Sequence, residues 1–327
     1  MAEAPERNLA MDIVRITEAA ALASARWLGR GDKNAGDGAA VEAMRNSFSS
    51  LPVDGVVVIG EGAKDNAPML SHGERVGTGS GTPLDVAVDP VEGTNLLAFG
   101  RPNAISVVSV APKGSMFNPG PSFYMRKLVV PKEASGVVDL DAPVDANLKN
   151  IAKAIGKRVQ DLVVFVLDKP RHKELIADIR AAGARIQLQS DGDVAGALMA
   201  CDPRSEVDCL LGVGGTPEGV ITACAIKGMA GEILARLEPQ SYVEKEAIEQ
   251  AGIDLRETFN SKTLVNSDDC FFAATGISTG DFLRGVRYDK QYAITHSLVI
   301  RGKTGTMRYI ESYHNISRLA KISAVKY

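Results

Sequence analysis

Five carboxylates in this chain of 327 residues stand where apolar segments give way to glycine-rich turns. Four of them follow the short apolar runs at 56–59, 84–88 and 209–213, and they are Glu61, Asp89, Glu92 and Glu218. The fifth, Asp37, lies in a glycine-rich break before a predicted helix. In open α/β sheets, ligands bind beyond the carboxyl ends of the strands. We therefore expect these side chains to gather at one site.

Converging carboxylates favour a particular class of cation. At pH 7 they repel one another unless a positive charge neutralises them. Their oxygens are hard ligands that suit Mg²⁺ or Mn²⁺ better than Zn²⁺, and the four histidines show no zinc-site spacing. The alternative is a set of solvated carboxylates that cap turns and helix starts, which explains one motif more easily than several. The pattern favours a magnesium or manganese site.

The most specific motif spans residues 89–94 and reads D-P-V-E-G-T. Pro90 fixes the turn, and Gly93 permits a close approach of the backbone. Asp89 and Glu92, three residues apart, can flank one metal ion. The Thr94 hydroxyl can orient a water molecule, and the amides of a following helix start can hold phosphate oxygens. The motif therefore points to phosphate chemistry at a metal.

The elements that must position these residues follow an alternating order. Apolar periodicity predicts helices at 8–28 and around 41–48, and strands at 56–59, 84–89 and 104–110. Strands at 162–167, 185–188 and 209–213 then alternate with helices at 173–182, 194–200 and 220–229. This rhythm predicts a largely parallel sheet covered by helices. A helix at 242–251 and strands at 270–274, 292–301 and 307–312 complete the chain.

Length and composition indicate a globular protein of two α/β domains or of one large two-part domain, and we place the two parts at 1–150 and 151–327. The net charge is -3, with both signs interspersed, which disfavours nucleic-acid and membrane-surface partners. No apolar run reaches the roughly 18 residues of a membrane span. The four cysteines form no CxxC pair and are expected to be reduced core thiols. We therefore expect a cytoplasmic protein.

The D-P-x-[DE]-G-T pattern at 89–94 is similar to the signature of the lithium-sensitive, metal-dependent phosphatases. Nearly the whole chain resembles one group of them, the class II (GlpX-type) fructose-1,6-bisphosphatases. The resemblance rests on G-R-G-D-K at 29–33, D-G-A-A-V at 37–41, G-E-G at 60–62, A-P-M-L at 67–70, K-P-R-H at 169–172, D-G-D-V at 191–194, G-G-T-P-E-G at 214–219 and A-T-G-I at 274–277. It implies a layered αβαβα sugar-phosphatase fold, with two mixed sheets sandwiched by helices.

The resemblance also implies residue roles. Asp37 and Glu61 would bind one of two Mg²⁺ or Mn²⁺ ions, and Asp89, Glu92 and Glu218 the other. Thr94, backed by Asp37 or Glu61, would orient the attacking water. Positions that match substrate contacts are Glu92, Gly93, Thr94, Tyr124, Lys169, Pro170, Arg171, Asp191, Gly192, Asp193 and Gly215. The roles of Tyr124 and Lys169 rest mainly on the resemblance.

Three cations have a competing explanation each, and for Lys169 it is that of an ordinary surface or core-edge residue. Lys33 would neutralise developing charge or be a solvated loop lysine. Lys169 and Arg171 would hold the distal phosphate, but Arg171 could instead cap the following helix or pair with Glu174. The chain also departs from its relatives, because Ala63 and Asn66 stand where acids are usual and Asn95 stands where Thr or Arg is frequent.

The reaction implied is hydrolysis of the 1-phosphate of fructose 1,6-bisphosphate to fructose 6-phosphate and phosphate, a step of gluconeogenesis. Sedoheptulose 1,7-bisphosphate is an alternative substrate, alone or in a bifunctional enzyme. A non-catalytic phosphate-binding regulator is an alternative of another class, although five acids converging on an anion argue against it. The partner expected is a small sugar bisphosphate, and the chain is expected to form a homodimer or homotetramer.

Overall fold

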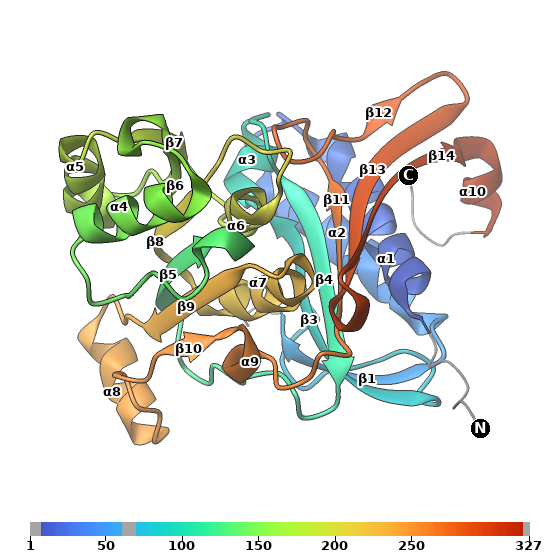
Figure 1. Cartoon of the computed structure of the whole chain (residues 1–327). Helices are drawn as coiled ribbons and strands as arrows, with labels where there is room; N and C mark the ends of the chain where they lie inside the picture. The colour runs from blue at the N-terminus through green and yellow to red at the C-terminus, as the bar shows by residue number, and fades with distance from the viewer. Residues whose placement is uncertain (1–7, 61–69, 323–327) are drawn as a thin grey trace, which may run out of the picture.

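The computed structural model describes residues 8–60 and 70–322, in which two β-sheets alternate with three layers of helices (Figure 1). Within the described residues, the first sheet has eight strands in the order β12-β13-β11-β4-β3-β1-β2, with β14 pairing with β13. Its strands are β1 (Val53–Ile59), β2 (Arg75–Val76), β3 (Thr82–Glu92), β4 (Ile105–Pro112), β11 (Phe271–Gly276), β12 (Arg287–Tyr288), β13 (Tyr292–Arg301) and β14 (Thr306–Asn315). Strands β1 and β3 run parallel, and the other pairs are antiparallel.

The second sheet has six strands in the described part of the chain, in the order β10-β9-β5-β8-β6-β7. They are β5 (Tyr124–Val130), β6 (Val163–Leu167), β7 (Arg185–Gln189), β8 (Cys209–Gly215), β9 (Glu232–Leu237) and β10 (Phe259–Asn260). Strand β6 is parallel to β7 and β8, and β5 is antiparallel to both β8 and β9. Thus β6, β7 and β8 point one way, as the alternating sequence predicts, and β9, which the sequence analysis did not predict, points the same way. Strand β5 arrives from the first sheet and is inserted between β8 and β9 in the opposite direction.

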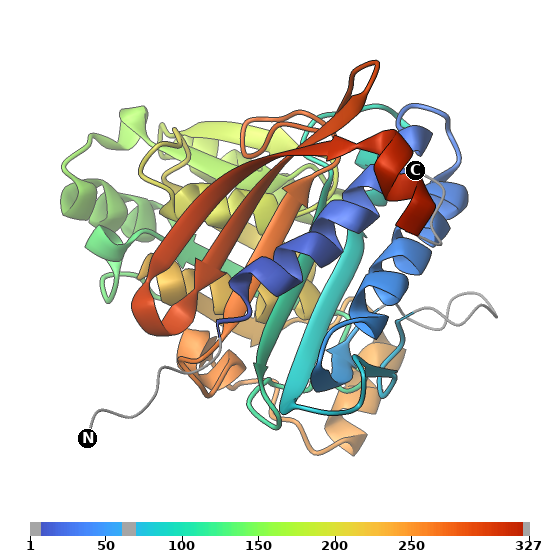
Figure 2. The same cartoon turned by 90° about the vertical axis from the view of Figure 1, so that its right-hand side faces the viewer.

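The helices sort into layers by the apolar faces they cover. Helices α1 (Ala10–Ser24) and α2 (Lys33–Ser49) cover the outer face of the first sheet (Figure 2). Helices α6 (Val194–Cys201) and α7 (Thr216–Met229) are buried between the sheets. Helices α4 (Val144–Ile155) and α5 (Lys173–Ala181) cover the far face of the second sheet. The expected αβαβα layering with two mixed sheets is confirmed.

Strand β6 shows how the sequence produces this layering. Its five residues are all buried, because both faces of the strand are covered. Val163, Phe165 and Leu167 pack toward α6 and α7, while Val164 and Val166 pack toward α4 and α5. Successive side chains of a strand point to opposite faces. A continuous apolar run is therefore what a strand between two helix layers requires.

The remaining elements connect these layers. Helix α3 (Thr94–Ala98) follows β3, α8 (Tyr242–Gln250) follows β9, α9 (Ser261–Leu264) precedes β11, and α10 (Ile316–Ile322) follows β14. Strands of the first sheet come from both ends of the chain, so the division at residue 150 remains a proposal. Within the described residues, no helix combines the length and apolarity needed to cross a membrane.

Candidate active site

Three acidic side chains meet at the junction of the two sheets. Asp89 and Glu92 lie at the end of β3, and Glu218 lies in the first turn of α7, directly after β8. One carboxylate oxygen from each lies within 4.8 Å of the others, and no other group of this kind occurs in the described part of the chain. The structure thus brings together three of the five acids that the sequence singled out.

The charges of this cluster are unfavourable without a cation. Burial, then repulsion from Glu218 and Asp193, raises the pKa of Glu92 to about 8. Burial also raises the pKa of Glu218, although the nearby Lys127 opposes the shift. One carboxylate oxygen of Glu218, Oε2, is buried and has no hydrogen-bond partner among the described residues. Hard oxygens with an unsatisfied buried atom fit a divalent cation such as Mg²⁺ or Mn²⁺.

Glycines allow the Glu218 segment to approach this closely. A Cβ atom at Gly215 would overlap the Oε2 atom of Glu218, and one at Gly214 would overlap Asp193. Gly93 has a φ of +90° and links the end of β3 to the start of α3. That left-handed conformation suits glycine, and it makes Thr94 the first residue of α3.

Asp37 lies in the first two turns of α2 and is not part of the three-acid group. Its Oδ1 atom is buried without a hydrogen-bond partner among the described residues, and burial raises its pKa to about 6. Helix α2 packs on α3, since a Cβ at Gly36 would meet the Leu97 side chain. Lys33 is exposed at the first position of α2. Glu61, with Ala63 and Asn66, lies outside the described residues.

The turn at 191–193 packs against the end of β3. The backbone amides of Asp193 and Val194 donate to Glu92 Oε1 at 2.8 and 2.9 Å. Glu92 therefore caps helix α6 from another part of the chain, which places a negative charge at a helix N-terminus. Asp193 does not cap its own helix, because its Oδ2 accepts a bond of 2.7 Å from Lys127 Nζ. Both side chains of this ion pair are buried, with 1% and 6% exposed.

The predicted substrate cations, Lys169 and Arg171, lie in the segment that follows β6. Lys169 Nζ lies 3.5 Å from Asp191 Oδ1, and Pro170 begins a short 3-10 turn. The guanidinium of Arg171 donates from Nε and Nη2 to the Val213 carbonyl at 3.0 and 2.8 Å, and lies 5.0 Å from the centre of the Tyr124 ring. Arg171 thus has a structural contact that the sequence did not suggest.

Sequence reasoning missed several residues that support the site. Lys127 was overlooked because a lysine in a strand carries no local signal of burial. Each ring nitrogen of His172 makes one hydrogen bond: Nδ1 with the Leu167 carbonyl at 2.7 Å, and Nε2 with the Val213 amide at 2.7 Å. Since an amide can only donate, His172 Nε2 is the acceptor and Nδ1 carries the proton. Burial lowers the pKa of His172, in keeping with this neutral form.

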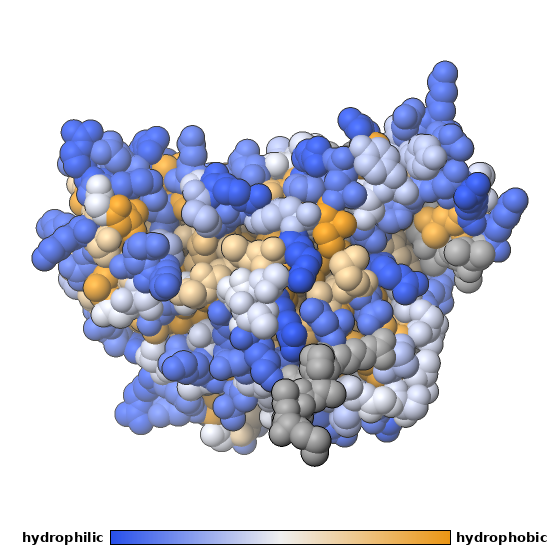
Figure 3. Space-filling model, turned by 45° about the vertical axis from the view of Figure 1, so that its right-hand side comes forward, coloured by the Kyte–Doolittle hydropathy of each residue, from blue (hydrophilic) through white to orange (hydrophobic). Residues whose placement is uncertain are grey.

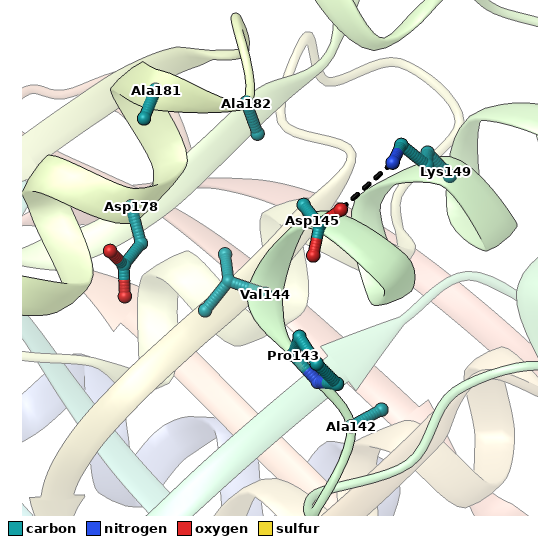
Figure 4. A pocket seen from close by; sticks show the side chains of 8 residues that line it. All are labelled: Ala142, Pro143, Val144, Asp145, Lys149, Asp178, Ala181 and Ala182. Atoms are coloured by element: carbon teal, nitrogen blue, oxygen red, sulfur yellow. Dashed lines mark hydrogen bonds and ion pairs between the residues drawn. The ribbon is translucent and has the colours of Figure 1, made fainter.

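A surface groove of about 660 Å³ lies elsewhere, between α4 and α5 (Figure 4). Its acids are Asp178 and Asp145, and Asp145 pairs with Lys149 at 2.8 Å. It contains none of the residues predicted for the site. The groove therefore has no convergent set of carboxylates, and the three-acid cluster remains the candidate site.

Comparison with known proteins identifies the family of the chain. Residues 7–314 match the family described as bacterial fructose-1,6-bisphosphatase, glpX-encoded. The chain is 44% identical over 325 residues to fructose-1,6-bisphosphatase 1 class 2 of Escherichia coli strain K12, with 95% of this chain and 96% of the relative covered. Identity and coverage are the same for fructose-1,6-bisphosphatase class 2 of Escherichia coli O6:H1 and of Shigella flexneri. The chain belongs to the glpX-encoded bacterial fructose-1,6-bisphosphatase family.

Proposed function

We propose that this chain hydrolyses the 1-phosphate of fructose 1,6-bisphosphate, giving fructose 6-phosphate and inorganic phosphate, in gluconeogenesis. Its family is one of phosphatases, so the chain is an enzyme of that class. The observation that carries the proposal is the group of Asp89, Glu92 and Glu218 beside the start of α3. Three converging acids suit a metal-assisted phosphatase better than a protein that only binds phosphate.

The three-acid cluster would hold one Mg²⁺ or Mn²⁺ ion, and Asp37 and Glu61 would hold a second. Divalent cations in such sites activate a water molecule and stabilise the charge on the phosphate and leaving oxygens. Two observations support the assignment to Asp37, namely its buried, unpartnered Oδ1 and the packing of α2 on α3. The assignment to Glu61 rests on the family resemblance.

The chain itself would supply orientation and charge. Thr94 would hold the attacking water through its hydroxyl, assisted by Asp37 or Glu61 as proton acceptor. Lys33 would neutralise charge that develops on the phosphate. Lys169 would bind the distal phosphate together with Arg171, and Tyr124, which lies against the Arg171 guanidinium, would line the sugar. The 191–193 turn, Gly93, Pro170 and Gly215 would complete the substrate site.

Thr94 offers a test of water orientation. Thr94→Ser keeps the hydroxyl and should retain part of the activity, whereas Thr94→Ala should lose most of it. Positioned proton transfer typically contributes about 10²- to 10⁴-fold to a rate. The measurement is kcat for phosphate release at saturating Mg²⁺. Equal rates for the two variants would remove Thr94 from this role.

A panel of phosphate-release assays tests the function as a whole. Fructose 1,6-bisphosphate should be hydrolysed only when Mg²⁺ or Mn²⁺ is added, and sedoheptulose 1,7-bisphosphate shows whether the enzyme is bifunctional. Titrating each metal separately identifies the preferred ion. Binding of fructose 1,6-bisphosphate without phosphate release under any of these metals would instead support the regulator.

We also propose a homodimer or homotetramer in the cytoplasm. The long strand β14 pairs with β13 alone within the described residues, and Met307 and Tyr313 on it are exposed. An uncovered strand of ten residues is a surface that proteins usually protect. Apolar and weakly polar residues gather near the centre of the face in Figure 3. Sedimentation velocity would measure the oligomeric state.

The proposed location in the cytoplasm has its own support. The free cysteines are buried, as is usual in a reducing compartment.

A further inference from the structure

The 191–193 turn is held by polar side chains from the segment that follows Thr94. Asn95 donates to Asp191 Oδ2 twice, from its backbone amide at 3.2 Å and from its side-chain Nδ2 at 3.1 Å. Lys169 approaches the other oxygen of the same carboxylate. Both oxygens of Asp191 are therefore engaged, and Asn95 fixes the orientation of a carboxylate that the proposed function assigns to the substrate.

A second contact reaches the turn through a pair of buried amides. Gln189 Nε2 donates to the carbonyls of Asp191 and Gly192 at 2.8 and 3.2 Å. Its other atom, Oε1, accepts a bond of 2.8 Å from Asn103 Nδ2. Asn103 and Gln189 are both buried, so water does not compete for these bonds. The turn is thereby connected to Asn103, nine residues beyond Thr94.

The direction of these bonds is dictated by the turn. Its two carbonyls can only accept, so Gln189 must present its NH₂ group to them and its oxygen to Asn103. Asn103 must then donate, which leaves its own Oδ1 buried without a partner among the described residues. That oxygen faces Gly280, where a Cβ atom would overlap it. Asn103 also has a left-handed φ of 72°. An unsatisfied oxygen and a strained backbone both cost stability, which indicates that something else maintains this arrangement.

We infer that Asn95 and the Asn103–Gln189 pair are positioning residues that hold the 191–193 turn for the ligand. These three residues, which we call the polar clamp, join the turn to the segment that carries Thr94. Because Asp193 and Val194 donate to Glu92, the clamp also holds the helix start that contacts a proposed metal ligand. The inference rests on the proposed function in one respect, that the turn contacts the sugar phosphate.

Two substitutions of Asn103 separate its side chain from its backbone. Asn103→Gly removes the side-chain amide group, while glycine adopts the left-handed backbone conformation without strain. Asn103→Asp keeps the shape but cannot donate to Gln189. Both should raise the KM for fructose 1,6-bisphosphate by about tenfold, the lower end of the effect of residues that orient ligand-binding groups, and kcat should change by less. Asn95→Ala should also raise this KM, and it supplies the same measurement if the Asn103 variants do not fold.

Asn147→Ala is the matched control. Asn147 is a buried asparagine that makes two hydrogen bonds to the backbone of Asp139 at 3.0 and 2.7 Å, on helix α4 in the outer layer. Its substitution should lower the melting temperature and leave KM unchanged. A KM effect confined to the clamp variants therefore cannot be ascribed to general loss of stability.

Hydrogen exchange supplies a reading that needs no substrate. The amides of Asp193 and Val194 should exchange about tenfold faster in Asn103→Gly than in the wild type, because weakening the turn by the equivalent of one hydrogen bond changes its opening equilibrium by that order. Unchanged exchange at 190–194, or an unchanged KM in all clamp variants, would overturn the inference. If the wild-type chain releases no phosphate from fructose 1,6-bisphosphate, the proposed function is wrong. The hydrogen-exchange rates at 190–194 would still test the polar clamp.

Discussion

At the scale of single residues, Glu92 and Glu218 have roles that differ despite their common charge. Both amides at the start of α6 occupy Oε1 of Glu92, so this carboxylate is oriented before any cation binds. Glu218 Oε2 has no such partner among the described residues. The affinity of the site for a cation should therefore depend most strongly on Glu218.

Glu218→Gln tests this difference. The substitution keeps the shape of the side chain but removes the charge that binds metal, so kcat should fall by several orders of magnitude while the fold is retained. Loss of a direct ligand should exceed the roughly 10- to 100-fold effect of residues behind the ligands. Phosphate release at saturating Mg²⁺ and circular dichroism are the measurements. A loss below about tenfold would remove Glu218 from the ligand set.

Arg171→Ala distinguishes a substrate contact from a structural one. A distal-phosphate contact predicts a fall in kcat/KM for fructose 1,6-bisphosphate of about 10- to 150-fold, from about 1.5 to 3 kcal/mol for a charge-assisted hydrogen bond. Fructose 1-phosphate lacks that phosphate and should be affected little. The bonds to the Val213 carbonyl predict instead an equal loss on both substrates and a lower melting temperature. The ratio of the two kcat/KM losses decides between them.

At the scale of elements, the site is made where strands end and helices begin. Local patterns predicted these junctions well, because the strand before Glu218 and the turn after it are contiguous in sequence. The contacts between junctions could not be predicted in this way. Glu92 and Asp193 are 101 residues apart, Lys127 and Asp193 are 66 apart, and Asn103 and Gln189 are 86 apart. No periodicity links such positions, and their pairing depends on the inserted strand β5 and on the contact of the β3–α3 junction with the turn before α6.

The ion pair between β5 and the turn before α6 leads to a prediction of stability. Lys127→Met should destabilise the protein by about 3 to 5 kcal/mol, because it leaves the Asp193 carboxylate buried without its cation. The double variant Lys127→Met with Asp193→Asn removes both charges and should regain part of this loss. Urea denaturation of both variants measures the free energy of unfolding. If the double variant is less stable than Lys127→Met, charge burial is not the cause.

At the scale of the whole molecule, protons and metal should compete for the cluster. The pKa of Glu92 is about 8 in the folded chain against a usual value near 4.3, so the folded state holds a proton that the unfolded state releases. Without metal, this group favours folding at low pH, and its contribution is lost as the pH rises from about 4.3 to about 8. Metal binding requires that proton to leave. The gain in melting temperature on adding Mg²⁺ should therefore increase over the same interval.

Removal of metal provides the matching experiment. EDTA should abolish phosphate release, and Mg²⁺ or Mn²⁺ should restore it. Li⁺ should inhibit, as the resemblance to lithium-sensitive phosphatases implies. In Glu218→Gln, the increase in melting temperature on adding Mg²⁺ should be much smaller at every pH. Full activity after exhaustive chelation would contradict a metal-assisted reaction.

The insertion of β5 has a consequence for how the chain folds during synthesis. Strand β5 is made before β8 and β9, the two strands that flank it, and they are complete only at residues 215 and 237. In the first sheet, β4 must likewise wait for β11 at 271–276. Pairings so distant in sequence form slowly, and exposed strand edges promote aggregation. We therefore expect nascent chains that end before residue 271 to remain protease-sensitive, and protection to appear only once β11 has left the ribosome.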